Sequence, residues 1–220
     1  PTGLGYTAET NLPLTWNAKT GENVLWKSPL PGQGHASPIV WDDAVFVCTA
    51  SWPTNVAASA REQVIPEHHV TCYQATDGKV RWDKLVPPGP WVRKDFRSGP
   101  GGGYAASTPA TDGKLVFVAF GSSVLAALDF QGKIVWRKEI VPASFDVTVG
   151  SSPILYEDTV ILFCAMAKQT DSCVIAFDKT SGAEKWRQKF PEMSFGHSTP
   201  VIIPVNGKPQ MLVLASGGST

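Results

Sequence analysis

A motif ending in tryptophan recurs four times along the 220-residue chain at nearly constant spacing. Each copy places a glycine four or five residues before the tryptophan. The copies are TGENVLW (20–26), DGKVRW (77–82), QGKIVW (131–136) and SGAEKW (181–186). Their last residues, Trp26, Trp82, Trp136 and Trp186, are separated by 56, 54 and 50 residues. A repeat of about 50 residues is typical of propellers and related arrays, in which each repeat is one structural unit.

A second motif, a small or hydroxyl residue followed by proline, interleaves with the first. Its copies are ASP (36–38), STP (107–109), SSP (151–153) and STP (198–200). An Asp-, Glu- or Asn-containing turn and two apolar runs then lead to the glycine turn and the tryptophan strand. Four antiparallel strands per repeat make one propeller blade. We therefore predict an all-β β-propeller with about four blade units, over 13–26 (partial), 37–82, 107–136, 151–186 and 198–220 (partial).

The glycines of the first motif have a conformational role. A tight turn between two strands often needs a positive φ, which glycine adopts without a Cβ clash. We expect this conformation at the four equivalent glycines, which are Gly21, Gly78, Gly132 and Gly182.

The repeat resembles that of the pyrroloquinoline-quinone-like (PQQ-like) propeller family, whose signature is Ala-x-Asp-x-x-Thr-Gly-x-x-x-Trp. The matching residues are Ala176, Asp178, Ser181, Gly182 and Trp186, and, with a shorter turn, Asp129, Gly132 and Trp136. The resemblance covers nearly the whole chain and extends to exported bacterial repeat proteins and to the outer-membrane assembly propeller lipoprotein. It implies that each tryptophan docks between blades and that the aspartates tie the turns to backbone donors.

The number of blades has two interpretations. The partial units at the two ends could join and close a four-bladed ring. The resemblance instead implies half of a seven- or eight-bladed propeller in a protein of about twice this length. We expect the second, because an open half-ring would expose strand edges and tryptophan faces.

Charge and hydropathy limit the partners. Lys plus Arg and Asp plus Glu both number 19, so no basic excess favours nucleic acid. The longest apolar runs are too short for a transmembrane segment. The opening PTGLGYTAET lacks the basic stretch and apolar core of a signal peptide. A periplasmic or extracellular location is therefore implied by the resemblance alone.

The longest departure from the repeat, residues 83–106, is the best candidate binding segment. It combines aromatic and cationic side chains with a glycine run, and its candidate residues are Trp91, Arg93, Phe96 and Arg97. Long loops of this kind often carry function, here binding of a partner or an anionic ligand. The alternative is a decorated surface loop. Trp52 and the loop 51–68 rank next and could leave the same face.

Two pairs of histidines are candidate ligands. His35 and His197 occupy the same repeat position and could face one ligand from different blades, or each could bond a loop carbonyl. His68 and His69 are adjacent, so a strand would point them to opposite faces and away from a shared metal.

The four cysteines, Cys48, Cys72, Cys164 and Cys173, form no CxxC motif, so we predict no zinc site. Cys164 and Cys173 flank a hairpin loop and could be cross-strand partners, either as a disulfide or as buried thiols. Catalytic quinoproteins of the resembled family carry two adjacent cysteines beside the quinone and acidic residues on calcium. This chain has no adjacent cysteine pair.

No P-loop, HExxH or Ser-His-Asp motif is visible, so we predict no catalytic residue and no metal ligand. The first hypothesis is a non-enzymatic, exported propeller that serves as a protein-interaction scaffold or ligand-binding platform. Its partner would be another protein or a small ligand at the propeller face. The alternative is a PQQ-dependent dehydrogenase whose quinone and calcium residues lie outside this segment.

Overall fold

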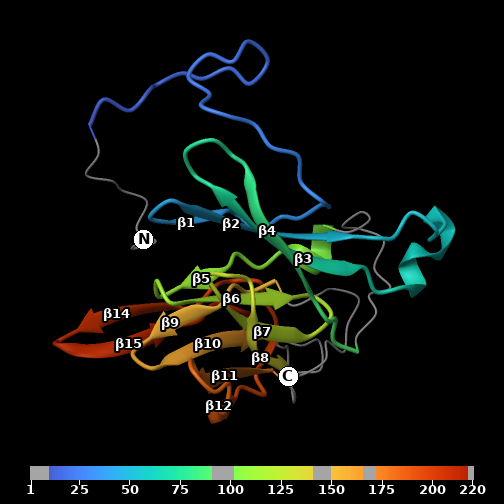
Figure 1. Cartoon of the computed structure of the whole chain (residues 1–220). Coiled ribbons are helices and arrows are strands. Elements are labelled where there is room, and N and C mark those ends of the chain that lie inside the picture. Colours follow the sequence, from blue (N-terminus) through green and yellow to red (C-terminus); the bar gives the residue numbers. More distant parts are fainter. Residues whose placement is uncertain (1–9, 91–101, 141–149, 166–171, 218–220) are drawn as a thin grey trace.

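The computed structural model describes residues 10–90, 102–140, 150–165 and 172–217. Consecutive strands pair antiparallel into three four-stranded sheets, which follow one another through the molecule (Figure 1). The first sheet holds β1 (Ile39–Trp41), β2 (Ala44–Ser51), β3 (Glu67–Gln74) and β4 (Val80–Val86). The second holds β5 (Ala110–Thr111), β6 (Leu115–Phe120), β7 (Val124–Asp129) and β8 (Ile134–Glu139). The third holds β9 (Ile154–Tyr156), β10 (Thr159–Cys164), β11 (Cys173–Asp178) and β12 (Glu184–Lys189).

Two smaller sheets follow the third blade. They pair β13 (Met193–Phe195) with β16 (Ser216–Gly217), and β14 (Val201–Val205) with β15 (Lys208–Leu212). The helical structure described is limited to two 3₁₀ turns, η1 (Ala58–Gln63) and η2 (Gly102–Ala105). Within the described ranges, no helix has the length and apolar character needed to cross a membrane. The predicted architecture of four-stranded antiparallel blades is confirmed.

The hydrophobic core lies in layers between successive sheets. Phe46 and Val70 of the first sheet pack with Val118 and Leu128 of the second. The opposite face of the second sheet packs on the third, and this layer includes Phe117, Leu125, Leu162 and Ile175. The two middle strands of a blade are thus covered on both faces, which explains why β6, β7, β10 and β11 read as continuous apolar runs.

Each of the first three motif tryptophans contacts the glycine turn of the following blade. The indole N–H groups of Trp26, Trp82 and Trp136 donate to the carbonyls of Ala75, Phe130 and Lys179, at 2.7, 2.9 and 2.7 Å. Their rings lie directly over Gly78, Gly132 and Gly182, in that order. A buried indole is stabilised both by the apolar area it covers and by a partner for its single N–H. The repeat spacing therefore corresponds to one recurring inter-blade contact.

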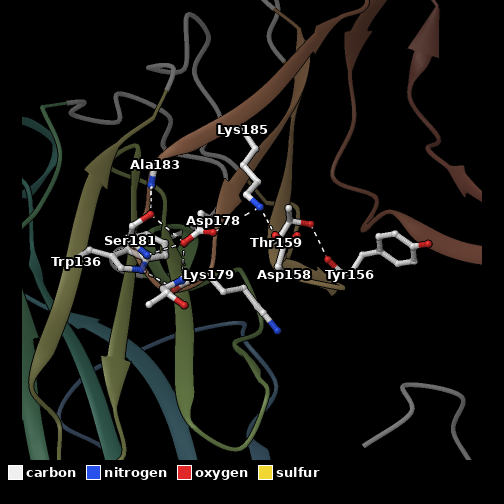
Figure 2. A network of polar contacts seen from close by, with 10 residues as sticks. Trp136, Tyr156, Asp158, Thr159, Asp178, Lys179, Ser181, Ala183 and Lys185 are labelled. Carbon is white, nitrogen blue, oxygen red and sulfur yellow. Dashed lines mark hydrogen bonds and ion pairs between the residues drawn. The ribbon is translucent and has the colours of Figure 1, made fainter.

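The turn beneath Trp136 shows how the motif residues build this contact (Figure 2). Asp178 Oδ1 accepts hydrogen bonds from the backbone N–H groups of Thr180 and Ser181 and from the Ser181 hydroxyl, at 3.0, 2.8 and 2.9 Å. These bonds hold the pKa of Asp178 below its usual value, and the two from Ser181 have the largest effect. Lys185 pairs with Asp158 and also lies 3.6 Å from Asp178 Oδ2. The carboxylate thus fixes the loop that presents the Lys179 carbonyl to Trp136.

We predict that Gly182→Ala costs about 1–3 kcal/mol more stability than Gly207→Ala. Both glycines have positive φ, 68° and 74°, so alanine is strained at either site. Only at Gly182 would a Cβ also lie 2.6 Å from the indole of Trp136, whereas at Gly207 nothing lies within 4 Å. Urea denaturation of the two variants measures the difference. Equal losses would show that the turn conformation, and not the indole contact, requires glycine at residue 182.

The second sequence motif also joins neighbouring blades. The backbone N–H of Ser37 donates to Thr108 Oγ1 at 3.0 Å, that of Thr108 to Ser152 Oγ at 2.9 Å, and that of Ser152 to Thr199 Oγ1 at 3.2 Å. Each of these residues directly precedes a proline, which supplies no backbone donor of its own. The hydroxyl residue of one blade therefore satisfies the backbone of the blade before it, and one chain of hydrogen bonds crosses four repeats.

Candidate binding face at the loop end of the blades

The connections of this fold separate into two ends because the strands of each blade alternate in direction. Short turns occupy one end, here called the turn face, at residues 42–43, 75–79, 112–114, 130–133, 157–158 and 179–183. The connections after β2, β4, β6, β8 and β10 leave the other end, here called the loop face. Every long departure from the repeat is among these connections. Variable loops on a rigid scaffold are a common place for binding.

The candidate insert 83–106 is anchored to the second blade near its N-terminal end, at residues 87–89, which are here called its first root. Arg137 of β8 donates from Nε to the carbonyl of Pro87 at 2.7 Å and from Nη2 to the carbonyl of Pro88 at 2.5 Å. The backbone N–H of Gly89 donates to Ser122 Oγ at 2.9 Å. The tight turn at Ser122 thus holds the chain at the point where the insert leaves the blade.

The C-terminal end of the insert, at residues 104–105, is here called its second root and is anchored as well. The carbonyl of Tyr104 in η2 accepts from the N–H of Gly121 at 2.8 Å. The carbonyl of Ala105 accepts from the N–H groups of His35 and Ala36, both at 3.0 Å. Both the first and the second blade therefore hold this root, and the insert spans a fixed interval on the loop face.

The structure brings the Trp52 loop against this second root. The rings of Trp52 and Tyr104 meet edge to face, with their centroids 6.3 Å apart. Arg61 of η1 lies over the Trp52 ring at 5.5 Å, and the indole N–H donates to the carbonyl of Val64 at 2.9 Å. The two segments selected from the sequence are therefore neighbours. Trp91, Arg93, Phe96 and Arg97 lie outside the described residues.

A buried histidine supports the first root from below. His68 is fully buried, stacks on Phe120 at a centroid distance of 4.6 Å, and lies with Nε2 2.7 Å from Ser122 Oγ. Because Ser122 Oγ already accepts from Gly89, its own hydrogen is available to donate to His68. Burial lowers the pKa of His68 to about 4, so the ring is neutral near pH 7. The loop root thus depends on an uncharged imidazole.

The adjacent His69 points to the opposite face of the sheet and joins a different network. Its Nδ1 lies 2.8 Å from Asp83 Oδ2, and its Nε2 lies 3.0 Å from Ser51 Oγ. The Thr71 hydroxyl donates to Asp83 Oδ1 at 2.8 Å. Ser51, His69 and Asp83 thus form a hydrogen-bonded Ser-His-Asp set, and the absence of a catalytic residue stays a prediction. Sequence motifs missed it because the three residues come from β2, β3 and β4.

This network has the order of an acid–base relay, in which a carboxylate orients an imidazole that can accept a serine proton. Acyl transfer would also need oxyanion donors and space for a substrate beside the hydroxyl. The contacts described for Ser51 supply the imidazole but no oxyanion donor. Since His69 is only 8% exposed, we interpret the set as the means by which the first blade satisfies its buried polar groups.

One repeat position differs chemically between blades at this end. In two blades, the residue after the motif tryptophan contacts the third-strand residue that lies three positions before the partner of that tryptophan. In the first blade this pair is Asp83 and His69, and in the third it is Arg187 and Cys173, with Arg187 Nη1 3.7 Å from the sulfur. The repeat therefore keeps the turn face constant while the loop end changes from blade to blade.

His35 and His197 are held by different blades. His35 bonds through its backbone to Ala105, whereas a Cβ placed on Gly150 would lie 2.3 Å from Nδ1 of His197. Partial burial there lowers the pKa of His197. The described contacts do not bring the two rings together. Over the described ranges, no group of three or more His, Cys, Asp or Glu side chains could hold a metal ion.

A cavity of about 360 Å³ lies between the third blade and the β14–β15 hairpin. Its lining includes Tyr156, Asp158, Lys185, Trp186 and Met211. Trp186 is 39% exposed here, whereas Trp136 is 7% exposed against its glycine turn. The four motif tryptophans are therefore not equivalent in their surroundings, and Trp186 contributes an aromatic wall to an open hollow.

Comparison with known proteins agrees with this architecture. Residues 66–220 match the family model described as outer membrane protein assembly factor BamB. No protein with a curated description matches the sequence.

Three solved β-propeller structures share the fold. BamB from Moraxella catarrhalis is 16% identical with a TM-score of 0.51, and the match covers 80% of this chain and 45% of that one. A europium-containing methanol dehydrogenase is 16% identical, with a TM-score of 0.50 and coverage of 71% and 25%. The quinohemoprotein alcohol dehydrogenase ADHIIG from Pseudomonas putida HK5 is 19% identical, with a TM-score of 0.50 and coverage of 75% and 22%. The chain thus spans less than half of each, and the predicted PQQ-like β-propeller is confirmed.

Proposed function

The chain belongs to the family of the outer membrane protein assembly factor BamB, and from this premise we propose that it is part of an exported propeller that binds a partner protein through its loop face. The scaffold would be non-enzymatic, and its location periplasmic or extracellular. The family assignment supports both parts of this proposal.

The observation that carries the proposal is the anchoring of the insert 83–106 at both roots. Arg137 and Ser122 fix one root, and the backbones of Gly121, His35 and Ala36 fix the other. A segment held at both ends loses less conformational entropy when a partner binds it. The neighbouring Trp52 and Arg61, which are partly exposed, add an aromatic and a guanidinium group, and such groups are enriched at protein interfaces.

Site-specific photocrosslinking tests this proposal. A benzophenone amino acid is placed at Asn55 or Ser59, which are exposed on the loop face, and in matched controls at Thr76 or Gln131, which are exposed on the turn face. Irradiation of cells that make the protein should join the loop-face variants to one discrete envelope protein and leave the turn-face variants uncrosslinked. Equal crosslinking from both faces, or none from the loop face, would contradict the proposal.

The rival function is quinone-dependent dehydrogenation, since the structural neighbours include a methanol dehydrogenase and a quinohemoprotein alcohol dehydrogenase. The donor groups described here do not fit it. All four cysteines are buried within strands and no two of them are consecutive in the sequence. Among the described residues, no group of three or more His, Cys, Asp or Glu could hold a metal ion. We therefore derive no step through calcium or PQQ. Incubation of the protein with both, followed by gel filtration, should leave no quinone absorbance with the protein, and stoichiometric retention would favour the dehydrogenase.

A further inference from the structure

Two cysteines face each other at the loop end of the third blade. Cys164 is the last residue of β10 and Cys173 the first of β11, and their register confirms that they are direct cross-strand partners. In an antiparallel ladder, hydrogen-bonded and non-hydrogen-bonded residue pairs alternate. At the other end of this ladder, the N–H of Lys179 donates to the carbonyl of Asp158, which marks a hydrogen-bonded pair. Cys164 and Cys173 lie six positions further along and are therefore also a hydrogen-bonded pair. Such pairs have Cα atoms about 5.5 Å apart, which is within the range that a disulfide spans.

A cation lies beside this pair. Arg187 of β12 donates from Nη1 to Cys173 Sγ at 3.7 Å and is itself held by Glu184 at 2.7 Å. The hydrogen bond with Cys164 and the Arg187 guanidinium lower the pKa of Cys173. The same hydrogen bond, together with burial, raises the pKa of Cys164. The first proton therefore leaves Cys173, and Cys164 keeps its own.

The other two cysteines lack this arrangement. Cys48 is paired across the sheet with Val70, and Cys72 with Phe46, so neither faces a sulfur. Burial raises the pKa of both thiols. At the repeat position of the cysteine pair, the second blade has Phe120 opposite Val124 and the first has Thr49 opposite His69. The paired thiols are thus particular to the third blade, and Cys48 and Cys72 serve as internal controls.

We propose that Cys164 and Cys173 are an oxidation site that closes to a cross-strand disulfide. The Cys173 thiolate attacks one sulfur of a disulfide oxidant, protein-borne or small, and releases the first thiol of that oxidant. Cys164 then loses its proton, attacks the mixed disulfide at Cys173 and releases the second thiol. The two protein thiols are oxidised, and one external disulfide is reduced to two thiols.

The bond would fasten together the two strand ends from which the 165–172 connection leaves on the loop face. Cys164 and Cys173 are 0% and 1% exposed, so closure takes place as the hairpin folds or when its end opens locally. Supply of the oxidant inside the organism rests on the proposed exported location, because disulfides persist in oxidising compartments. The chemistry of the pair does not rest on it.

Alkylation mapping of purified protein tests the proposal. The reduced chain is incubated with oxidised and reduced glutathione, alkylated, digested with trypsin and measured by mass spectrometry. Lys168 lies between the two cysteines, so a bond between them joins peptides 139–168 and 169–179, whereas Cys48 and Cys72 lie on separate peptides. We expect that crosslink alone, with Cys48 and Cys72 alkylated only after unfolding. A persistently reduced pair, or bonds in which Cys48 or Cys72 takes part, would overturn the proposal.

Two further measurements test the role of the guanidinium and the proposed exported location separately. Arg187→Gln should slow closure about threefold near neutral pH, because loss of the guanidinium lowers the thiolate fraction of Cys173 and greater nucleophilicity offsets part of this. The matched Arg81→Gln variant, which removes the arginine that pairs with Asp43 in the first blade, should close at the unaltered rate. An unchanged rate in Arg187→Gln would contradict the role of the guanidinium. Protein that closes in vitro but is isolated from cells fully reduced would support the site and count against the exported location.

Discussion

Replacing Trp136 with alanine is expected to lower the free energy of unfolding by about 3–5 kcal/mol. The ring is 7% exposed, lies over Gly182 and packs near Phe117 at a centroid distance of 6.1 Å. Truncation would open a cavity between the second and third blades and leave the Lys179 carbonyl without its indole donor. Urea denaturation followed by circular dichroism measures the loss.

Trp186→Ala is the matched control, because it removes the same side chain from the same repeat position. Trp186 is 39% exposed beside the cavity, so its truncation should cost about 1 kcal/mol. A loss at Trp186 as large as that at Trp136 would contradict the view that the contact with a following glycine turn stabilises the blades.

Acidification is expected to remove about 3 kcal/mol of stability through His68 alone. The folded-state pKa of about 4 is below the ordinary value of 6.5. Between these two pH values, the unfolded chain therefore binds a proton at His68 that the folded chain does not bind. The contribution is complete above pH 6.5 and is lost progressively as the pH falls towards 4. Denaturation midpoints collected between pH 4 and pH 7 should therefore decrease by the equivalent of about 1.4 kcal/mol per pH unit in the steepest part.

His68→Gln tests the origin of this pH dependence, since glutamine can still bond Ser122 but does not titrate. The variant should be less stable at pH 7 and should lose most of the slope between pH 4 and 6.5. His35→Gln, which alters an exposed histidine on the same face, should retain the slope. An undiminished slope in His68→Gln would show that other groups cause the acid sensitivity.

Much of the fold could be predicted because its signals are local. The glycine of SGAEKW takes φ of 68°, and Asp178 bonds the turn three residues later, so a stretch of ten residues contains the information for its own shape. The apolar runs of β10 and β11 have no polar face, which indicates strands covered on both sides. The interleaved Ser/Thr-Pro motif was visible too, but its role in bonding one blade to the next was not.

The candidate site was only partly predictable. The insert 83–106 and the Trp52 loop were found because they interrupt the repeat, and the structure adds that Trp52 meets Tyr104 at the root of that insert. Ser51, His69 and Asp83 are separated by 18 and 14 residues, and no local pattern indicates that three strands bring them together. The adjacent His68 and His69 have different partners because they point to opposite faces of β3. His68 contacts Phe120 and Ser122 of the second blade, whereas His69 bonds within its own blade.

The sequence by itself determined the blade, because turn chemistry and strand periodicity act over a few residues and recur with each tryptophan. It also indicated that Cys164 and Cys173 could pair across a short hairpin. Only the tertiary structure decided which tryptophan is covered, which histidine is buried neutral, and where Arg187 reaches a sulfur. Those outcomes depend on the register between strands and on the neighbouring blade, since burial and pKa are set by groups that are distant along the chain.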